Sequence, residues 1–309
     1  MWIRLAAGMA LFLGSLGLGW WLNRRGRLTE ARASQLVRFV VMGPSPIVLC
    51  LSFWRMELRH FEPWLLPLIG AAISAAALVP AAVYARRARL SSPQAGSFLT
   101  CAFFSNLGYL GAFTAFALYG ERAYALCQLY LVFFTPCFYT LGFGIAAAYG
   151  RSRQPSALGS AYQGELRLYP FAGMMLGVLL SFTGVPRPPA FEYVNHVLIP
   201  VDTALYLLAI GAQLRFESPR PWLGACLAMC GIKFLYLPLV ALVLLNAFGI
   251  TGLARFIVLL EASTSVAVSP LVLPLLFGLD RRLSNALLLV TTAAAIPWFI
   301  LVIPLLQRL

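Results

Sequence analysis

The sequence predicts an all-α polytopic membrane protein, and its composition and the spacing of its apolar segments lead to that expectation. Of the 309 residues, 61% are hydrophobic and 11% are charged, and the mean hydropathy is +0.84. A soluble globule of this length could not cover so much apolar surface. Long apolar stretches recur along the chain and are separated by short segments that carry arginine, glycine and proline.

Ten stretches are long enough to span a bilayer, for which a helix needs about 20 apolar residues. In chain order they are 2–22, 34–54, 63–85, 97–119, 124–148, 168–184, 194–214, 222–247, 253–277 and 284–306. The first is interpreted as a retained helix and not as a cleaved signal peptide, because Ala6, Ala7 and Gly8 precede most of its apolar core.

The net charge of +13 comes largely from arginines between the expected helices. They are more frequent after odd-numbered helices, as with Arg24 and Arg25 after the first and Arg86 and Arg87 after the third. Because short cytoplasmic loops are enriched in arginine, we expect both termini to be non-cytoplasmic. We expect an integral protein of a bilayer such as the bacterial inner membrane, and no binding to nucleic acid.

Short segments of the first half of the chain, several of them with glycine or proline, recur in the second half in the same order. The matches are 102–106 with 260–264, 118–120 with 276–278, Pro80 with Pro238 and, after one short insertion, 41–44 with 197–200. An odd number of helices in each copy reverses its direction through the membrane. We therefore predict two inverted five-helix repeats, 1–149 and 168–309, joined by a cytoplasmic connector over 150–167 that is rich in Gly, Ser, Pro and Arg.

Residues that weaken or break helices occur in the second and fourth helices of each half. In the second and seventh helices they are Pro44, Pro46 and Pro200; in the fourth and ninth they are Asn106, Gly108, Gly111, Ser263, Thr264, Ser265, Ser269 and Pro270. Membrane helices also accept such residues as kinks or close-packing positions. Paired interruptions at corresponding positions instead favour a substrate site. We expect that site at Asn106, Gly108, Gly111, Ser263, Thr264 and Ser265.

Three charged residues fall inside the expected helices and are candidates for ion or proton coupling. A carboxylate such as Glu261 near the centre of a bilayer costs about 2.5–3.5 kcal/mol. It could carry a proton, bind a cation together with the neighbouring hydroxyls, or be neutralised by an internal partner. Asp202 and Lys233, the only lysine, could form a buried ion bridge, or Lys233 could titrate or face an anion.

Motifs of enzymes and pumps are missing from the sequence. It has no Ser-His-Asp grouping, phosphate-binding loop or HExxH motif, and only two histidines. The six cysteines show no CxxC spacing. We therefore expect no enzyme, no cofactor, no metal site and no ATP-driven pump, so that any active transport draws on ion gradients.

Two motifs, over 106–111 and 117–121, resemble the auxin efflux carrier family of membrane transporters, which includes bacterial permeases and the plant auxin carriers. Further similar segments are 26–28, 141–142, 208–214 and 233–239, so the resemblance covers nearly the whole chain. It implies a scaffold and a transporter bundle, with the fourth and ninth helices unwound where they cross. It also implies an anionic organic substrate near the crossing, with Asn106 corresponding to an amide that helps to bind its carboxylate.

The sequence departs from that family at the crossing, where the family usually has proline. Here Phe113 or its neighbours stand in the first half and Thr264 and Ser265 in the second, while Pro270 comes later. Helix opening must then depend on Gly108, Gly111 and the serine-threonine run.

The function expected from these features is secondary transport, or facilitated movement, of a small organic anion by alternating access. The amide half of the site would recognise the substrate, and the half with Glu261 would couple transport to a proton or sodium. One alternative is a sodium-coupled symporter for a bile-acid-like anion, and another is a non-transporting membrane sensor or enzyme. The expected partners are the substrate, the ion and the lipid bilayer, and a homodimer is among the arrangements that the sequence allows.

Overall fold

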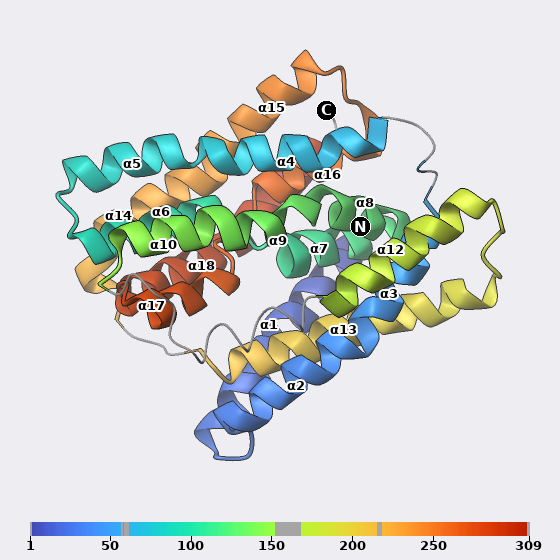
Figure 1. Cartoon of the computed structure of the whole chain (residues 1–309), viewed down its shortest axis with the longest axis horizontal. Coiled ribbons are helices and arrows are strands. Elements are labelled where there is room, and N and C mark those ends of the chain that lie inside the picture. The colour runs from blue at the N-terminus through green and yellow to red at the C-terminus, as the bar shows by residue number, and fades with distance from the viewer. Residues whose placement is uncertain (1, 57, 59–61, 152–167, 215–217, 308–309) are drawn as a thin grey trace. The chain divides into compact units, whose positions relative to one another are not determined.

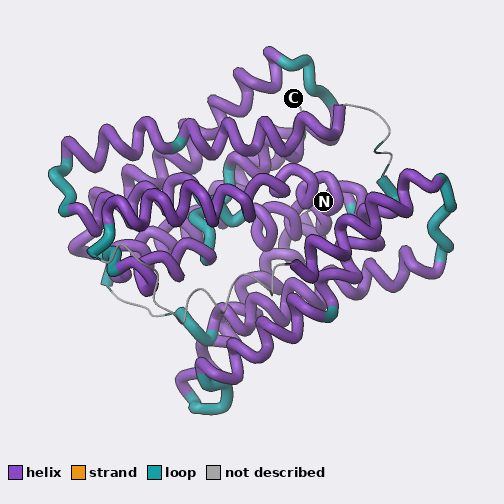
Figure 2. The backbone as a smooth tube through the Cα atoms, viewed as in Figure 1, coloured by secondary structure: helices purple, strands orange, loops and turns teal. Residues whose placement is uncertain are grey.

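The computed structural model describes residues 2–56, 58, 62–151, 168–214 and 218–307. Within these ranges the chain is almost wholly helical and contains no strand (Figures 1 and 2). In the described part of the chain, seven helices are long and apolar enough to cross a membrane: Ile3–Arg24, Glu30–Trp54, Leu65–Arg87, Glu121–Tyr149, Ala190–Gly211, Arg220–Ala247 and Arg281–Leu306. This confirms a polytopic, all-helical membrane protein.

The chain divides into two compact units, each assembled from separate segments. Unit 1 comprises Met1–Trp64, Gly108–Gln128 and Ser160–Leu214, and unit 2 comprises Leu65–Leu107, Leu129–Gly159 and Arg215–Leu309. Each half of the sequence therefore contributes to both units. Most of the predicted connector over 150–167 lies outside the described residues.

Unit 1 contains both long and short helices. They are α1 (Trp2–Arg24), α2 (Glu30–Met42), α3 (Pro44–Trp54), α7 (Ala112–Tyr119), α8 (Glu121–Tyr130), α12 (Leu168–Thr183) and α13 (Ala190–Gly211), with a short 3₁₀ turn, η1 (Glu62–Trp64). A π-helical turn, η2 (Leu107–Gly111), carries the chain from unit 2 into α7.

Unit 2 contains more interrupted helices. They are α4 (Leu65–Ala76), α5 (Leu78–Arg87), α6 (Ser92–Phe103), α9 (Phe134–Cys137), α10 (Phe143–Tyr149), α14 (Leu223–Gly231), α15 (Leu237–Ala247), α16 (Gly252–Ala262), α17 (Val272–Phe277) and α18 (Arg281–Leu306). Between them lie the 3₁₀ turns η3 (Leu131–Phe133), η5 (Arg220–Trp222) and η7 (Ser269–Leu271) and the π-helical turns η4 (Phe138–Gly142) and η6 (Ile232–Tyr236).

Glycine allows the helices of unit 1 to pack backbone against backbone. A Cβ atom added at Gly19 in α1 would lie 2.0 Å from the carbonyl oxygen of Leu208 in α13. One added at Gly177 in α12 would lie 2.4 Å from the carbonyl oxygen of Cys50 in α3. Lipid chains are as apolar as leucine, so membrane helices associate by such close approach and not by a hydrophobic effect between them.

Two predicted helices are interrupted in the structure. The helix expected over 97–119 consists of α6, a non-helical segment over 104–106, η2 and α7. The helix expected over 253–277 consists of α16, a non-helical segment over 263–268, η7 and α17. Ser105 and Val266, one in each gap, form an isolated antiparallel bridge.

The prolines do not all act as expected. Pro44 and Pro46 lie in the first turn of α3, after the chain leaves the helical region at Gly43. The break predicted at Pro200 is wrong, because α13 runs through it without interruption. Proline removes a single hydrogen bond, and the turns on either side keep that helix continuous. Pro270 does not begin a break either, because it lies in η7, where the helix resumes. At the start of a helix the N–H groups have no intrahelical acceptor, so the N–H that proline lacks is not needed there.

Two glycines that the sequence alignment places at equivalent positions have similar roles. Gly120 ends α7 with φ of 75°, and Gly278 ends α17 with φ of 68°. Each donates its N–H to the carbonyl oxygen four residues earlier, in Phe116 and Pro274 respectively. A positive φ favours glycine because it has no Cβ. The equivalence agrees with the alignment, while the ten-helix inverted repeat stays a prediction.

The packing of α1 against α13 can be tested with two glycines of one helix. Gly19→Ala should destabilise the protein by about 1–3 kcal/mol, the usual range for inserting a methyl group into a closely packed site. Gly17→Ala is the matched control, because a Cβ there meets nothing within 4 Å. Thermal unfolding of the two purified variants in detergent measures the difference, and equal midpoints would contradict the close approach.

Candidate functional site

The two interrupted helices of unit 2 complete their hydrogen bonding across the gap between them. The backbone N–H of Asn106 donates to the carbonyl oxygen of Ser265 at 2.8 Å. The N–H of Ala267 donates to the carbonyl oxygen of Phe104 at 3.0 Å. An unsatisfied backbone group inside a bilayer costs several kcal/mol. This reciprocal pairing allows both segments of the chain to leave the helical conformation at the same place.

Aromatic packing holds the first gap in position. The ring of Phe104 lies 5.0 Å from that of Phe134 and 5.3 Å from that of Phe138, both edge to face. Gly142 provides the room, since a Cβ there would lie 3.1 Å from the Phe104 ring. The gap lies upstream of Gly108 and is formed by Phe104, Ser105 and Asn106. The expectation that the glycines open this helix is therefore wrong, because they lie in η2, where it resumes.

Lys233 is fully buried and binds the end of α6. Its Nζ atom donates to the carbonyl oxygen of Ala102 at 2.6 Å and to Oγ of Ser105 at 2.7 Å. The carbonyl end of a helix carries partial negative charge, so an ammonium group is a favourable partner there. The π-helical turn η6 contains this lysine, next to Pro238 at the start of α15. Lys233 thus supports the first gap directly.

Two threonines of α18 support the second gap. The backbone N–H of Val266 donates to Oγ1 of Thr291 at 3.1 Å, and Oγ1 of Thr292 donates to Oγ of Ser265 at 3.3 Å. Neither residue was anticipated from the sequence. Hydroxyls in an apolar helix more commonly bond to their own backbone, so the sequence carries no signal for this contact.

The remaining hydroxyls of the second gap bind their own helix. Oγ of Ser263 donates to the carbonyl oxygen of Leu259 at 2.8 Å, and Oγ1 of Thr264 donates to that of Glu261 at 2.9 Å. These carbonyls belong to the last turn of α16, where intrahelical donors run out; the carbonyl of Glu261 also accepts the backbone N–H of Thr264 at 3.3 Å. Glu261 lies in the same turn and is fully buried.

The side-chain amide of Asn106 differs from its neighbours. The residue is only 5% exposed, and among the residues that the structure describes nothing hydrogen-bonds to this amide. An amide can both donate and accept. A buried polar group without a partner is costly, so this side chain is available for a ligand.

Other predicted site residues belong to unit 1. Gly108 and Gly111 lie in η2, and Asp202 lies in α13, where its Oδ1 accepts a hydrogen bond of 2.6 Å from Oγ of Ser45. Near it in sequence, Tyr206 stacks on Tyr109 with ring centroids 4.0 Å apart. The structure thus brings Asn106, Lys233, Glu261 and the second gap into unit 2, while Asp202 and the two glycines belong to unit 1. Asp202 and Lys233 each have a hydrogen-bond partner within their own unit.

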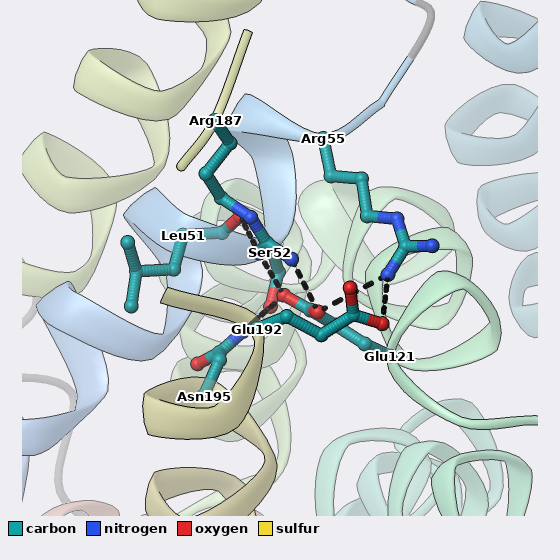
Figure 3. A network of polar contacts seen from close by, with 7 residues as sticks. All are labelled: Leu51, Ser52, Arg55, Glu121, Arg187, Glu192 and Asn195. Atoms are coloured by element: carbon teal, nitrogen blue, oxygen red, sulfur yellow. Dashed lines mark hydrogen bonds and ion pairs between the residues drawn. The ribbon is translucent and has the colours of Figure 1, made fainter. Parts of the chain in front are cut away.

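A buried ionic network in unit 1 was not anticipated from the sequence (Figure 3). Both terminal nitrogens of Arg187 donate to the carboxylate of Glu121, one to Oε1 and the other to Oε2 at 2.8 Å. Nδ2 of Asn195 also donates to Glu121 and, at 2.9 Å, to Oγ of Ser52. The network joins α3, α8, the loop before α13, and α13 itself. Its only sequence signal was a carboxylate directly after Gly120.

These features define a polytopic helical membrane protein with two paired helix interruptions. The chain is 25% identical over 280 residues to an uncharacterized transporter of Methanothermobacter thermautotrophicus, covering 89% of each chain. It is also 25% identical over 214 residues to an uncharacterized transporter of Methanocaldococcus jannaschii, covering 66% of each. No family model matches the sequence.

The role of Lys233 can be tested by removing its ammonium group while keeping an apolar side chain of similar length. Lys233→Met should destabilise the protein, since a hydrogen bond to a charged group contributes about 1.5–3 kcal/mol. Ser105→Ala should cost less, because the contact with Ala102 remains. Their effects should not add in the double variant, since both disrupt one contact. Thermal unfolding measures all three, and a Lys233→Met variant as stable as the original protein would refute the role.

Proposed function

We propose that the protein is a secondary transporter or facilitator for a small organic anion, with the substrate held beside the paired helix interruptions. The similarity to two proteins named as transporters supports transport in general. The amide of Asn106, to which none of the described residues hydrogen-bonds, is the observation that carries the proposal for this site. An amide and freed backbone donors can bind a carboxylate without a fixed ion pair that would slow its release.

The donor groups around the first gap favour an anion. Nζ of Lys233 donates to Oγ of Ser105, the residue next to Asn106. The first turn of a helix has N–H groups without intrahelical acceptors and carries partial positive charge, and η2 is the first turn after Asn106. Gly108 and Gly111 lie in that first turn, and we assign their backbone to the same role.

The hydroxyl half of the site has a different role in this proposal. Ser263 and Thr264 already donate to their own helix, and Ser265 accepts from Thr292. Their lone pairs and the carboxylate of Glu261 suit a proton or cation better than an anion. We therefore propose Glu261 as the first candidate for the coupling residue, followed by Asp202 and Lys233.

The proposal extends to architecture and family. Ten spanning segments in two inverted repeats would place the interruptions at symmetric positions, as alternating access requires. The matched helix ends at Gly120 and Gly278 support this arrangement. Membership of the auxin efflux carrier family, both termini outside the cytoplasm and a location in a bacterial inner membrane belong to the same proposal.

Replacing Asn106 tests substrate binding. Asn106→Ala should lower kcat/KM for carboxylate uptake about ten- to a hundredfold, the equivalent of losing one or two hydrogen bonds to a charged group. Uptake of a panel of radiolabelled mono- and dicarboxylates into proteoliposomes provides the measurement. Asn285→Ala is the matched control, since Asn285 is also a 5% exposed amide but lies in α18 outside both gaps. Undiminished uptake by Asn106→Ala would refute the site.

Replacing Glu261 tests coupling. Glu261→Gln keeps the size of the side chain but cannot carry a proton or a negative charge. An imposed proton or sodium gradient should no longer accelerate uptake by this variant, while exchange of substrate without a gradient should continue. Gradient dependence that persists in Glu261→Gln and disappears in Asp202→Asn would transfer the role to Asp202. If uptake still depends on the gradient in both variants, neither carboxylate is the coupling residue.

A further inference from the structure

A solvent-accessible cavity of about 620 Å³ lies in unit 1, beside the buried network of Figure 3. It lies where the membrane helices end: α3 stops at Trp54, and Arg55 and Met56 continue into the cavity wall. The loop over 184–189 and Glu192 of α13 line the other side. Small-molecule sites usually measure about 300–1,000 Å³, so a small organic compound fits in this volume.

The walls of the cavity are fixed in place before any ligand arrives. Gly184 ends α12 with φ of 74°, and Pro186, Pro188 and Pro189 then restrict the backbone of the loop. Nε1 of Trp54 donates to the carbonyl oxygen of Val185 at 2.9 Å, which ties the loop to α3. A preformed wall lowers the entropy that binding must overcome.

Two guanidinium groups at this cavity differ in their freedom. The side chain of Arg187 is 5% exposed, and it is held by the buried carboxylate of Glu121 and by the carbonyl oxygen of Leu51. The side chain of Arg55 is 47% exposed and donates through Nη1 to Glu192, which is 46% exposed, at 2.7 Å. Ion pairs with this exposure contribute about 0–1 kcal/mol. Glu192 can therefore be displaced from Arg55, whereas Glu121 cannot be displaced easily from Arg187.

The guanidinium of Arg55 also has unused capacity. Arginine carries five N–H donors in a planar fork that matches a carboxylate. The hydrogen bond to Glu192 uses one nitrogen, and Glu121 approaches the same nitrogen at 3.7 Å. Among the described residues, Nε and Nη2 of Arg55 have no partner, so an incoming carboxylate can bind there with two parallel hydrogen bonds.

The rest of the lining includes Ser181 and a set of apolar side chains. Trp54, Met56, Val185 and the loop prolines supply the apolar part, and the ring of Phe191 backs that of Trp54 at 5.9 Å. We propose that this cavity binds an organic carboxylate with an apolar body, held by Arg55 in competition with Glu192. Binding at this site is independent of the proposed function; only its use as the place where a transported anion is first captured rests on that function.

Binding can be measured with 4-fluorobenzoate as the probe, by ¹⁹F NMR titration of the purified full-length protein. The Asn106→Ala variant serves as background, so that the proposed inner site does not contribute. Arg55→Gln should weaken binding of the probe tenfold or more. Raised salt should weaken binding to the background protein, in which the cavity residues are unchanged. Glu192→Gln should strengthen it severalfold, because the competing carboxylate is lost. A gain of affinity cannot result from misfolding.

Three controls make the outcome decisive. Arg122→Gln removes an exposed arginine of α8 that does not line the cavity, and it should leave binding unchanged. Arg55→Lys should retain part of the affinity, and 4-fluorobenzyl alcohol, the neutral analogue, should bind weakly. The proposal would be overturned if Arg55→Gln bound the probe as tightly as the Asn106→Ala background does. It would also be overturned if Glu192→Gln left the affinity of that background unchanged. Probe binding that depends on Arg55 in a protein that transports no carboxylate would refute the proposed function and leave this site standing.

Discussion

Inside a bilayer no water is available to hydrogen-bond an open backbone, and the arrangement of unit 2 follows from that constraint. Where α6 and α16 end, the N–H groups of Asn106 and Ala267 find carbonyl partners in the opposite gap. Lys233 binds the carbonyl of Ala102, and Thr291 binds the N–H of Val266. The turn η6 and the helix α18 thus supply groups that the two broken helices require.

The same requirement separates the side chains near the gaps into two groups. The hydroxyls of Ser263 and Thr264 bind carbonyl oxygens in the last turn of α16, so they stabilise the structure first. The side-chain amide of Asn106 makes no such structural contact, because the backbone N–H of this residue is the group that pairs with Ser265. A residue whose main chain makes the structural contact leaves its side chain for binding. This division accounts for the unequal composition of the two halves of the site.

The different burial of Arg187 and Arg55 in unit 1 likewise gives these two arginines different roles. Removing water strengthens the attraction within the pair of Arg187 and Glu121 and raises the cost of breaking it. The pair of Arg55 and Glu192 is half exposed, so water and salt screen it. Identical chemical groups therefore act as a permanent structural link in one case and as an exchangeable contact in the other.

Length, hydropathy and punctuation are local properties, so they were enough to predict the membrane class, most of the helices and the two interrupted segments near Asn106 and Ser263. Contacts between distant segments have no such local signal. The alignment of the halves gave Ser105 and Ser263 as equivalent positions and carried no information on contacts, and the structure bridges Ser105 to Val266. Pro200 stayed within a continuous helix, Lys233 bound a helix end, and Glu121 became the centre of a buried network. Each of these results depended on which groups the fold brought within hydrogen-bonding distance, and that is decided by packing in three dimensions.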